Sequence, residues 1–155
     1  MKRFLAGTAF LFLIAAGTAC WAGPAEEVAQ IAAPRLKALY SGDVEAYVDA
    51  YADDAVFYSS FTPFRIEGKD QIRAFFSQLV QMYLKRQVFI RHPIARVYND
   101  NLVIQSSYAV LNWTNAKGEY ETFDTRVSTV WTKMDGKWKI VDQHFSRLPV
   151  PGHPR

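Results

Sequence analysis

The chain has 155 residues, of which 50% are hydrophobic and 21% are charged, and its 18 Lys and Arg slightly exceed its 15 Asp and Glu. This length suits one ordinary domain with a real core, and the composition excludes a disordered or collagen-like chain. A single cysteine excludes an internal disulfide framework and a cysteine-based zinc knuckle.

The amino-terminal residues 1–22 have the three parts of a secretory signal peptide. The chain begins Met-Lys-Arg, continues with an apolar run of 13 residues over 4–16, and then has small residues up to the Ala22-Gly23 step. The sequence therefore predicts a signal peptide over 1–22, cleaved near Ala22, and an exported protein that is periplasmic or secreted.

A lipid anchor is the alternative for this segment. Residues 17–20 can be interpreted as a lipobox that ends at Cys20, but Gly17 stands where such motifs usually have Leu. A lipoprotein anchored at Cys20 is therefore the less favoured interpretation. The apolar run is also too short to cross about 30 Å of hydrocarbon comfortably, so no stable membrane span is expected.

The positive charge belongs largely to the signal peptide, because its removal leaves 16 basic and 15 acidic residues, a net charge of 16 − 15 = +1. Nucleic-acid binding needs clustered Lys and Arg, so no nucleic-acid partner is predicted. Lys85, Arg86, Arg91 and Arg96 are a modest local concentration, which we interpret as a solvated strand edge.

Helical signals come first along the remaining chain. Pro24 suits a helix start, the apolar residues Val28, Ile31, Ala32, Leu36 and Leu39 recur at helical spacing up to Ser41-Gly42, and Pro34 should kink or split the helix. Asp43 is the expected N-cap of a short second helix whose apolar residues run to Tyr51, and Asp53-Asp54 should end it.

A strand is then expected at 55–58, and a third helix from Gly68, with its buried face formed by Ile72, Phe75, Phe76, Leu79, Val80 and Tyr83. Strand signals dominate afterwards, over 87–98, 102–114, 119–133 and 137–146, followed by a short tail at 149–155. Helices collected before an antiparallel meander indicate an α+β fold.

Two stretches carry a resemblance to a known family: YSGDVEAYVDAYADDAVFYSSFTPFRIEGKDQIRAFF and VWTKMDGKWKIVDQHFSRLP. The chain resembles the NTF2-like superfamily, and within it the SnoaL-like proteins and the bacterial relatives of the kinase association domain. The resemblance implies one domain over 23–148, with three N-terminal helices packed on a curved antiparallel sheet. It also implies a conical pocket and, usually, a dimer. It implies no single activity.

The chemistry that the resemblance would carry is missing at the matched positions. The general base and oxyanion tyrosine of the related isomerases fall on Ser59 and Arg35, and serine cannot act as a free base. The arginines that clamp a carboxylate in association domains fall on Tyr108, Thr129 and Phe145. These positions suggest a wider, more apolar cavity with a few hydroxyls.

Strand alternation gives a further expectation for the sheet faces. The odd-numbered residues of 119–133 and 137–146 are the more apolar set and should face the helices, with Trp138 and Ile140 on the opposite face. A three-residue turn at 134–136 would pair Arg126 with His144.

His144 is the weak catalytic candidate, since Asp142 could tune its imidazole, although a structural histidine on a dimer-facing or solvent-facing surface is the plainer interpretation. The histidines are scattered and give no metal-ligand spacing, and there is no Gly-rich phosphate loop. No metal and no cofactor are expected.

Two functions remain open. The first is a binding module that holds a small, largely apolar molecule; the second is a SnoaL-like enzyme catalysing isomerisation, cyclisation or dehydration by proton transfer. The residues expected to line the pocket are Arg35, Ser59, Tyr108, Asn112, Thr129 and Trp131. An enclosed Arg35 should meet a carboxylate, a carbonyl or an anionic ligand. A homodimer through the sheet faces is also expected.

Overall fold

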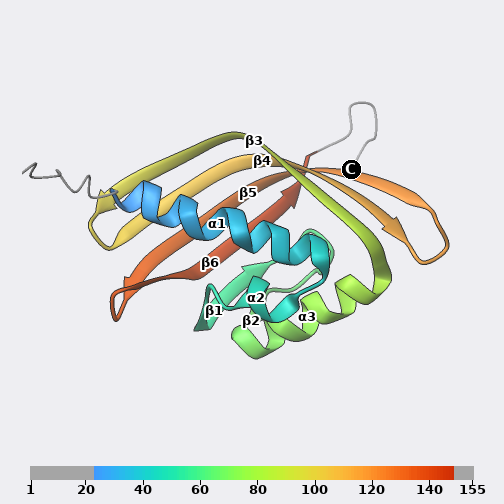
Figure 1. Cartoon of the computed structure of the whole chain (residues 1–155), viewed down its shortest axis with the longest axis horizontal. Helices are drawn as coiled ribbons and strands as arrows, with labels where there is room; N and C mark the ends of the chain where they lie inside the picture. Colours follow the sequence, from blue (N-terminus) through green and yellow to red (C-terminus); the bar gives the residue numbers. More distant parts are fainter. Residues whose placement is uncertain (1–22, 149–155) are drawn as a thin grey trace, which may run out of the picture.

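The computed structural model describes residues 23–148. The predicted signal peptide at 1–22, with its cleavage site and Cys20, and the tail at 149–155 lie outside the described residues. The elements are α1 (Pro24–Ser41), α2 (Val44–Val48), β1 (Tyr51–Tyr58), β2 (Ile66–Glu67), α3 (Lys69–Met82), β3 (Tyr83–Asn99), β4 (Leu102–Asn115), β5 (Tyr120–Met134) and β6 (Lys137–Arg147) (Figure 1). The predicted α+β fold is confirmed.

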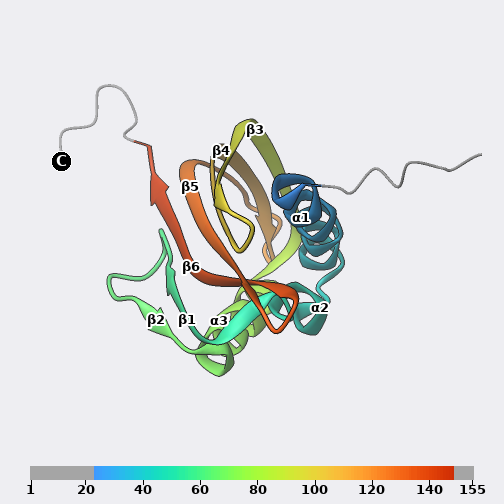
Figure 2. The same cartoon turned by 90° about the vertical axis from the view of Figure 1, so that its left-hand side faces the viewer.

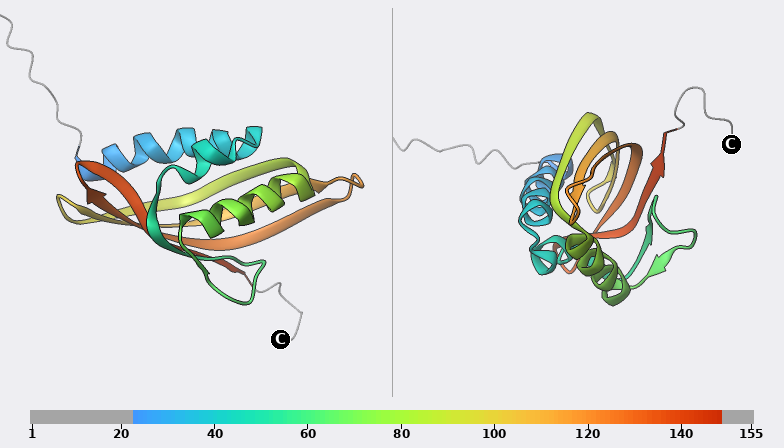
Figure 3. Two further views of the ribbon diagram at one scale, coloured as in Figure 1. Left: turned by 90° about the horizontal axis from the view of Figure 1, so that it is seen from below. Right: turned by 90° about the vertical axis from the view of Figure 1, so that its right-hand side faces the viewer.

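The strands form one six-stranded sheet in the order β2-β1-β6-β5-β4-β3. All neighbours are antiparallel except β1 and β6, which are parallel. The long strands curve, and the helices gather on one side of the sheet (Figure 2). Seen from below, α1 and α3 both lie lengthwise along the long strands (Figure 3). This arrangement places the core, and any cavity, between the helices and the inner sheet face.

Helix α1 begins at Pro24 as predicted and ends at Ser41, and the following Gly42 caps it with a left-handed φ of 81°. The expected break at Pro34 is wrong, because α1 runs through this residue as one helix. Pro34 and Gln30, four residues earlier, are both exposed. Water can therefore solvate the carbonyl that the missing proline N–H leaves free, which lowers the penalty for an internal proline.

The second helix has the predicted N-cap, because the Asp43 carboxylate accepts a hydrogen bond of 3.0 Å from the Ala46 N–H. The helix ends earlier than expected, and Tyr51 already belongs to β1, where it pairs with Ile140 of β6. Asp53 and Asp54 do not end a helix; they are exposed residues within β1. Two consecutive strand residues can both be exposed here because the register of β1 on β6 shifts between Tyr51 and Val56.

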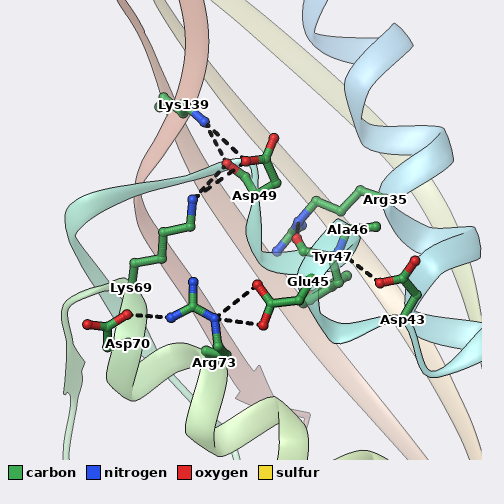
Figure 4. A network of polar contacts seen from close by, with 10 residues as sticks. All are labelled: Arg35, Asp43, Glu45, Ala46, Tyr47, Asp49, Lys69, Asp70, Arg73 and Lys139. Atoms are coloured by element: carbon green, nitrogen blue, oxygen red, sulfur yellow. Dashed lines mark hydrogen bonds and ion pairs between the residues drawn. The ribbon is translucent and has the colours of Figure 1, made fainter.

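A polar network holds α2 between α3 and β6 (Figure 4). Arg73 of α3 contacts Glu45 at 2.8 Å, and Asp49 lies 3.7 Å from the Lys69 ammonium and 3.9 Å from that of Lys139. The acidic partners are exposed, so each pair contributes only about 0–1 kcal/mol. Figure 4 also shows Arg35 reaching from α1 towards Tyr47 of α2.

Strand β6 changes its face at a bulge. The turn before it is the two residues Asp135-Gly136, and the register of β5 on β6 then shifts between Val130 and Trp131. An extra residue on one strand reverses the alternation. Trp138 and Ile140 are therefore buried together with Gln143, and their predicted place on the opposite face is wrong. The predicted Arg126–His144 pair is also wrong, since His144 pairs with Ser128 and Arg126 with Ser146.

Arg86 is not part of a solvated strand edge, as its neighbours Lys85, Arg91 and Arg96 are. It is 7% exposed, because position 86 faces the helices. Its guanidinium donates to the carbonyls of Leu39 at 2.9 Å, Tyr40 at 3.2 Å and Val80 at 3.1 Å, and also to Tyr83. It thereby joins the ends of α1 and α3, where helix carbonyls lack intrahelical partners.

Candidate functional site

A cavity of about 290 Å³ lies between the helices and the inner face of the sheet. Its walls come from α1, α2, α3, the end of β1 and strands β3–β6, and most of them are apolar, for example Leu36, Phe57, Phe76, Leu79, Val88 and Leu111. An apolar cavity with a few convergent polar groups is the usual form of a small-molecule site.

Arg35 is the only Lys or Arg in the described wall of this cavity. It is 7% exposed and projects from α1, which turns its apolar residues to the sheet. Its Nε donates to the Tyr47 carbonyl at 2.9 Å, and its Nη2 donates to Gln143 Oε1 at 3.2 Å. Two aromatic rings cover the guanidinium, with Cζ 3.9 Å from the Tyr47 centroid and 4.7 Å from that of Tyr51.

The charge of Arg35 has no acidic partner among residues 23–148, where every ion pair found involves other residues. Its contacts are a backbone carbonyl, an amide oxygen and ring faces. A guanidinium has five N–H donors, and the two hydrogen bonds use two of them. The guanidinium, at a residue that lines the cavity, therefore keeps its positive charge and N–H groups that these two bonds do not use.

Gln143 of β6 organises the polar part of the wall. Its Oε1 accepts from Arg35 and, at 2.5 Å, from the Tyr51 hydroxyl, while its Nε2 donates to Thr129 Oγ1 at 2.8 Å. Burial raises the pKa of the Tyr51 hydroxyl well above its ordinary value, although the Arg35 charge opposes this. The tyrosine is thus a neutral hydrogen-bond donor at any physiological pH.

The structure brings four of the six expected pocket residues to the cavity, namely Arg35, Ser59, Thr129 and Trp131. Ser59 lies just after β1, and its Oγ accepts from the Phe61 N–H at 3.0 Å. Trp131 donates its indole N–H to Gln105 at 2.8 Å. Gln105 pairs with Thr129 across β4 and β5, so it holds the indole at the same end of the cavity as Thr129.

Tyr108 and Asn112 are not in the cavity wall. In the β4–β5 register, odd residues pair with odd residues, so the face that carries Thr129 and Trp131 continues through Gln105 and Leu111 of β4. Tyr108 pairs with Arg126 and Asn112 with Thr122 on the alternate positions, and Tyr108 is 47% exposed. The predicted placement of Tyr108 and Asn112 in the pocket is therefore corrected. It combined even residues of β4 with odd residues of β5, which the register of the two strands puts on opposite faces.

His144 lies on the outer face as well. It is exposed, pairs with Tyr58 and Ser128 on the neighbouring strands, and has its ring 5.4 Å from that of Tyr58. Burial raises the pKa of nearby Asp142, and His144 opposes this.

Among the described residues that line the cavity there is no carboxylate and no imidazole. Within 23–148 no three His, Cys, Asp or Glu gather where they could hold a metal ion.

The wall residues that were not expected from the sequence include Gln143, Phe61 and Trp113. Gln143 was placed on the inner face, and a polar residue among apolar neighbours there is a signal for a site. Phe61 follows β1 in a segment without periodicity, so no pattern could place it. Trp113 shares its strand face with Leu111, whereas the sequence prediction placed the opposite face, with Asn112, in the pocket.

No helix within residues 23–148 has both the length and the apolar character needed to span a bilayer.

Known structures share this fold. A protein from Xanthomonas campestris, described as a candidate calcium/calmodulin dependent protein kinase II association domain, is 26% identical, covers 83% of this chain and 90% of its own, and superposes with a TM-score of 0.74. An NTF2-like superfamily protein from Salmonella enterica is 19% identical, with coverages of 83% and 94% and a TM-score of 0.73.

A candidate scytalone dehydratase from Novosphingobium aromaticivorans has the same TM-score of 0.73 at 11% identity, with coverages of 83% and 87%. Relatives this distant show the NTF2-like fold alone, and their names range from association module to dehydratase. Residues 24–149 match the family described as the calcium/calmodulin dependent protein kinase II association domain. The chain belongs to this association-domain family, within the NTF2-like fold.

Proposed function

We propose that this protein binds a small, largely apolar molecule with an anionic group in the cavity between its helices and sheet. The observation that carries the proposal is Arg35, a buried cation with spare donors in a wall that is mostly apolar. An uncompensated buried charge is unfavourable, and an anionic ligand group would relieve it with charge-assisted hydrogen bonds.

The neighbours of Arg35 support this role. The Tyr47 carbonyl and Gln143 fix the plane of the guanidinium, and Gln143 is itself fixed by Tyr51 and Thr129. A donor whose position is set before the ligand arrives loses little conformational entropy on binding. The apolar wall around it would remove the rest of the ligand from water, at about 25 cal/mol for each Å² buried.

Proton-transfer chemistry, the alternative from the sequence, is less well supported. A general base or acid near neutral pKa is needed within hydrogen-bond reach of the substrate, and the described cavity wall offers no carboxylate or imidazole. Burial moves the pKa of Tyr51 further from neutrality, and His144 lies on the other face of the sheet. Binding is therefore the function that the geometry favours.

A carboxylate and its neutral analogue test the proposal directly. We expect octanoate to bind the parent protein roughly tenfold or more tightly than octanamide, measured by isothermal titration calorimetry. Arg35→Met should abolish this preference while retaining weak apolar binding. Arg91→Met is the matched control, because it removes the same charge from an exposed position outside the cavity wall.

Two results would reject the proposal: neither compound binds the parent, or Arg35→Met keeps the preference for octanoate. In the second case a group other than Arg35 would bind the carboxylate.

Export and dimerisation belong to the proposal as well. Export rests on the composition of residues 1–22. The intact mass of the mature protein tests it, since a retained Met1 or a diacylated Cys20 would contradict cleavage near Ala22.

The dimer rests on exposed apolar residues of the sheet, among them Phe89, Ile94 and Tyr108. Light scattering tests it at micromolar concentration, where a strictly monomeric mass would contradict it.

A further inference from the structure

The indole of Trp113 differs from the other tryptophans that the structure describes. Trp131 donates its N–H to Gln105 at 2.8 Å, and Trp138 donates to the Glu27 carboxylate at 2.6 Å. Trp113 is 3% exposed, and its Nε1 is buried without a hydrogen-bond partner. An indole N–H can only donate, so nothing within this side chain compensates it.

A second polar atom in the same cavity wall shares this state. Ser60 and Trp113 both line the cavity, and the hydroxyl oxygen of Ser60 is buried without a partner. These are the two side-chain atoms of this kind found within residues 23–148. A buried polar group left unpaired lowers the stability of the folded protein by about 1–3 kcal/mol, and such groups are rare in native structures. Two in one cavity wall point to something that pairs with them there.

Phe61 connects Ser60 and Trp113, the two residues that carry these atoms. It follows Ser60 in the chain, and its ring stacks on Trp113 with centroids 5.0 Å apart and planes at 18°. Residues 59–65 lie between β1 and β2 and pair with no strand. Arg147 lies over the Phe61 ring at 5.2 Å and over Phe123 at 4.3 Å. Phe61 is therefore held by ring contacts with Trp113, Phe123 and Arg147 and by no sheet pairing.

These atoms lie far from Arg35 along the cavity. Gln143, the partner of Arg35, pairs with Thr129 on β5, whereas Phe61 contacts Phe123 on the same strand. The separation of six residues corresponds to about 20 Å of strand.

We infer that Trp113 and Ser60 form a second, hydrogen-bonding subsite, which takes an oxygen acceptor at the apolar end of the ligand. This inference rests on the proposed function and gives its ligand class: an elongated aliphatic carboxylate with a carbonyl oxygen near the far end. The carboxylate meets Arg35, the chain lies along the apolar wall, and the carbonyl accepts from the Trp113 N–H and the Ser60 hydroxyl.

The test compares two chains of equal carboxylate and similar length, tridecanoate and 12-oxotridecanoate. The parent protein should bind the keto acid about five- to tenfold more tightly by calorimetry, the gain typical of a neutral hydrogen bond. In ¹⁵N-resolved NMR spectra, the indole proton of Trp113 should move downfield with the keto acid and not with tridecanoate. Trp113→Phe assigns this signal and should abolish the preference.

Ser60→Ala supplies a smaller change in case Trp113→Phe disturbs the fold, and it should reduce the preference. Ser128→Ala is its control, because Ser128 is an exposed serine on the outer face. Equal binding of both acids by the parent, or a preference that survives both Trp113→Phe and Ser60→Ala, rejects the subsite alone. Failure of both acids to bind rejects the subsite together with the proposed function.

Discussion

The molecule buries two arginines to the same extent and uses them differently. Arg35 and Arg86 are each 7% exposed, and neither meets a carboxylate within the described chain. Arg86 donates to four backbone carbonyls at the ends of α1 and α3. Arg35 donates to one carbonyl and one amide oxygen and faces the cavity.

The difference shows that burial alone is a poor guide to the role of a charge. The better guide is whether the N–H donors already have acceptors within the fold. Arg86 has found acceptors from the fold itself, so it acts as a brace between two helix ends. Burial lowers its pKa, although a guanidinium stays protonated. Arg35 makes only two hydrogen bonds within the described chain and lines the cavity, which is why we propose that a ligand pairs with it. Substitutions at the two sites should therefore separate stability from binding.

The largest effect is expected for Arg86→Met. This change removes the buried donor from the carbonyls of Leu39, Tyr40, Val80 and Tyr83, of which Leu39 also accepts the Gly42 N–H. Each buried carbonyl left unpaired costs about 1–3 kcal/mol. The free energy of unfolding should fall by about 3 kcal/mol or more in urea titration. Lys85→Met, at the exposed neighbouring position, should change it by less than about 0.5 kcal/mol. Similar values for both variants would show that Arg86 is no brace.

Arg35→Met should have the opposite profile. It removes two hydrogen bonds and the contacts with the Tyr47 and Tyr51 rings, but it also removes a buried charge without an acidic partner. The free energy of unfolding should fall by about 1–2 kcal/mol, less than for Arg86→Met, while the preference for octanoate disappears. A loss of stability as large as that of Arg86→Met would make Arg35 a structural residue as well.

A substitution at Gly42 tests how closely the Arg86 guanidinium packs against the end of α1. Gly42 has a φ of 81°, and a Cβ there would lie 3.1 Å from Arg86 Nη2. Gly118 has a similar φ of 84° and nothing within 4 Å of a Cβ, so Gly118→Ala measures the backbone strain alone, about 1–2 kcal/mol. Gly42→Ala should lower the free energy of unfolding by up to about 1 kcal/mol more, because Arg86 has to shift. Equal losses would mean that the guanidinium adapts freely.

Local patterns in the sequence predicted most elements, because they depend on local chemistry: Pro24 and Asp43 mark helix starts, and three of the long strands lie where alternation placed them. The exception is β3, which begins at Tyr83, a residue expected on the third helix. The faces of the strands were harder to predict. One bulge reverses the alternation in β6, and the register of β4 on β5 decides that Tyr108 points outwards. These features depend on pairing between distant residues, which one-strand patterns do not contain.

The two arginines show the same limit. Arg35 was expected in the pocket through a resemblance, whereas Arg86 was grouped with exposed charges because Lys85 and Arg91 are near it in sequence. Whether a donor is satisfied depends on the carbonyls that surround it in space. Those carbonyls come from residues 39–40 and 80–83, and the first pair lies more than forty residues away in sequence.

The smallest effect is expected at Asp142, a half-buried carboxylate on the outer face. Burial raises its pKa, and His144 opposes the rise only in part. An acid whose pKa is higher in the folded protein than in the unfolded chain binds its proton better when folded, so its ionisation destabilises the fold as the pH rises through this range. Asp142→Asn should therefore raise the free energy of unfolding at pH 7, by less than about 1 kcal/mol.

The gain from Asp142→Asn should shrink towards zero below about pH 4, where the carboxyl is protonated in both states. Urea titrations at pH 7 and pH 3.5 measure both values, and Asp124→Asn, at an exposed position on the same face, is the control. A gain that is the same at both pH values would mean that the amide acts through shape or hydrogen bonding. A loss at pH 7 would mean that the Asp142 charge has a stabilising partner, which would place it with Arg86 and not with Arg35.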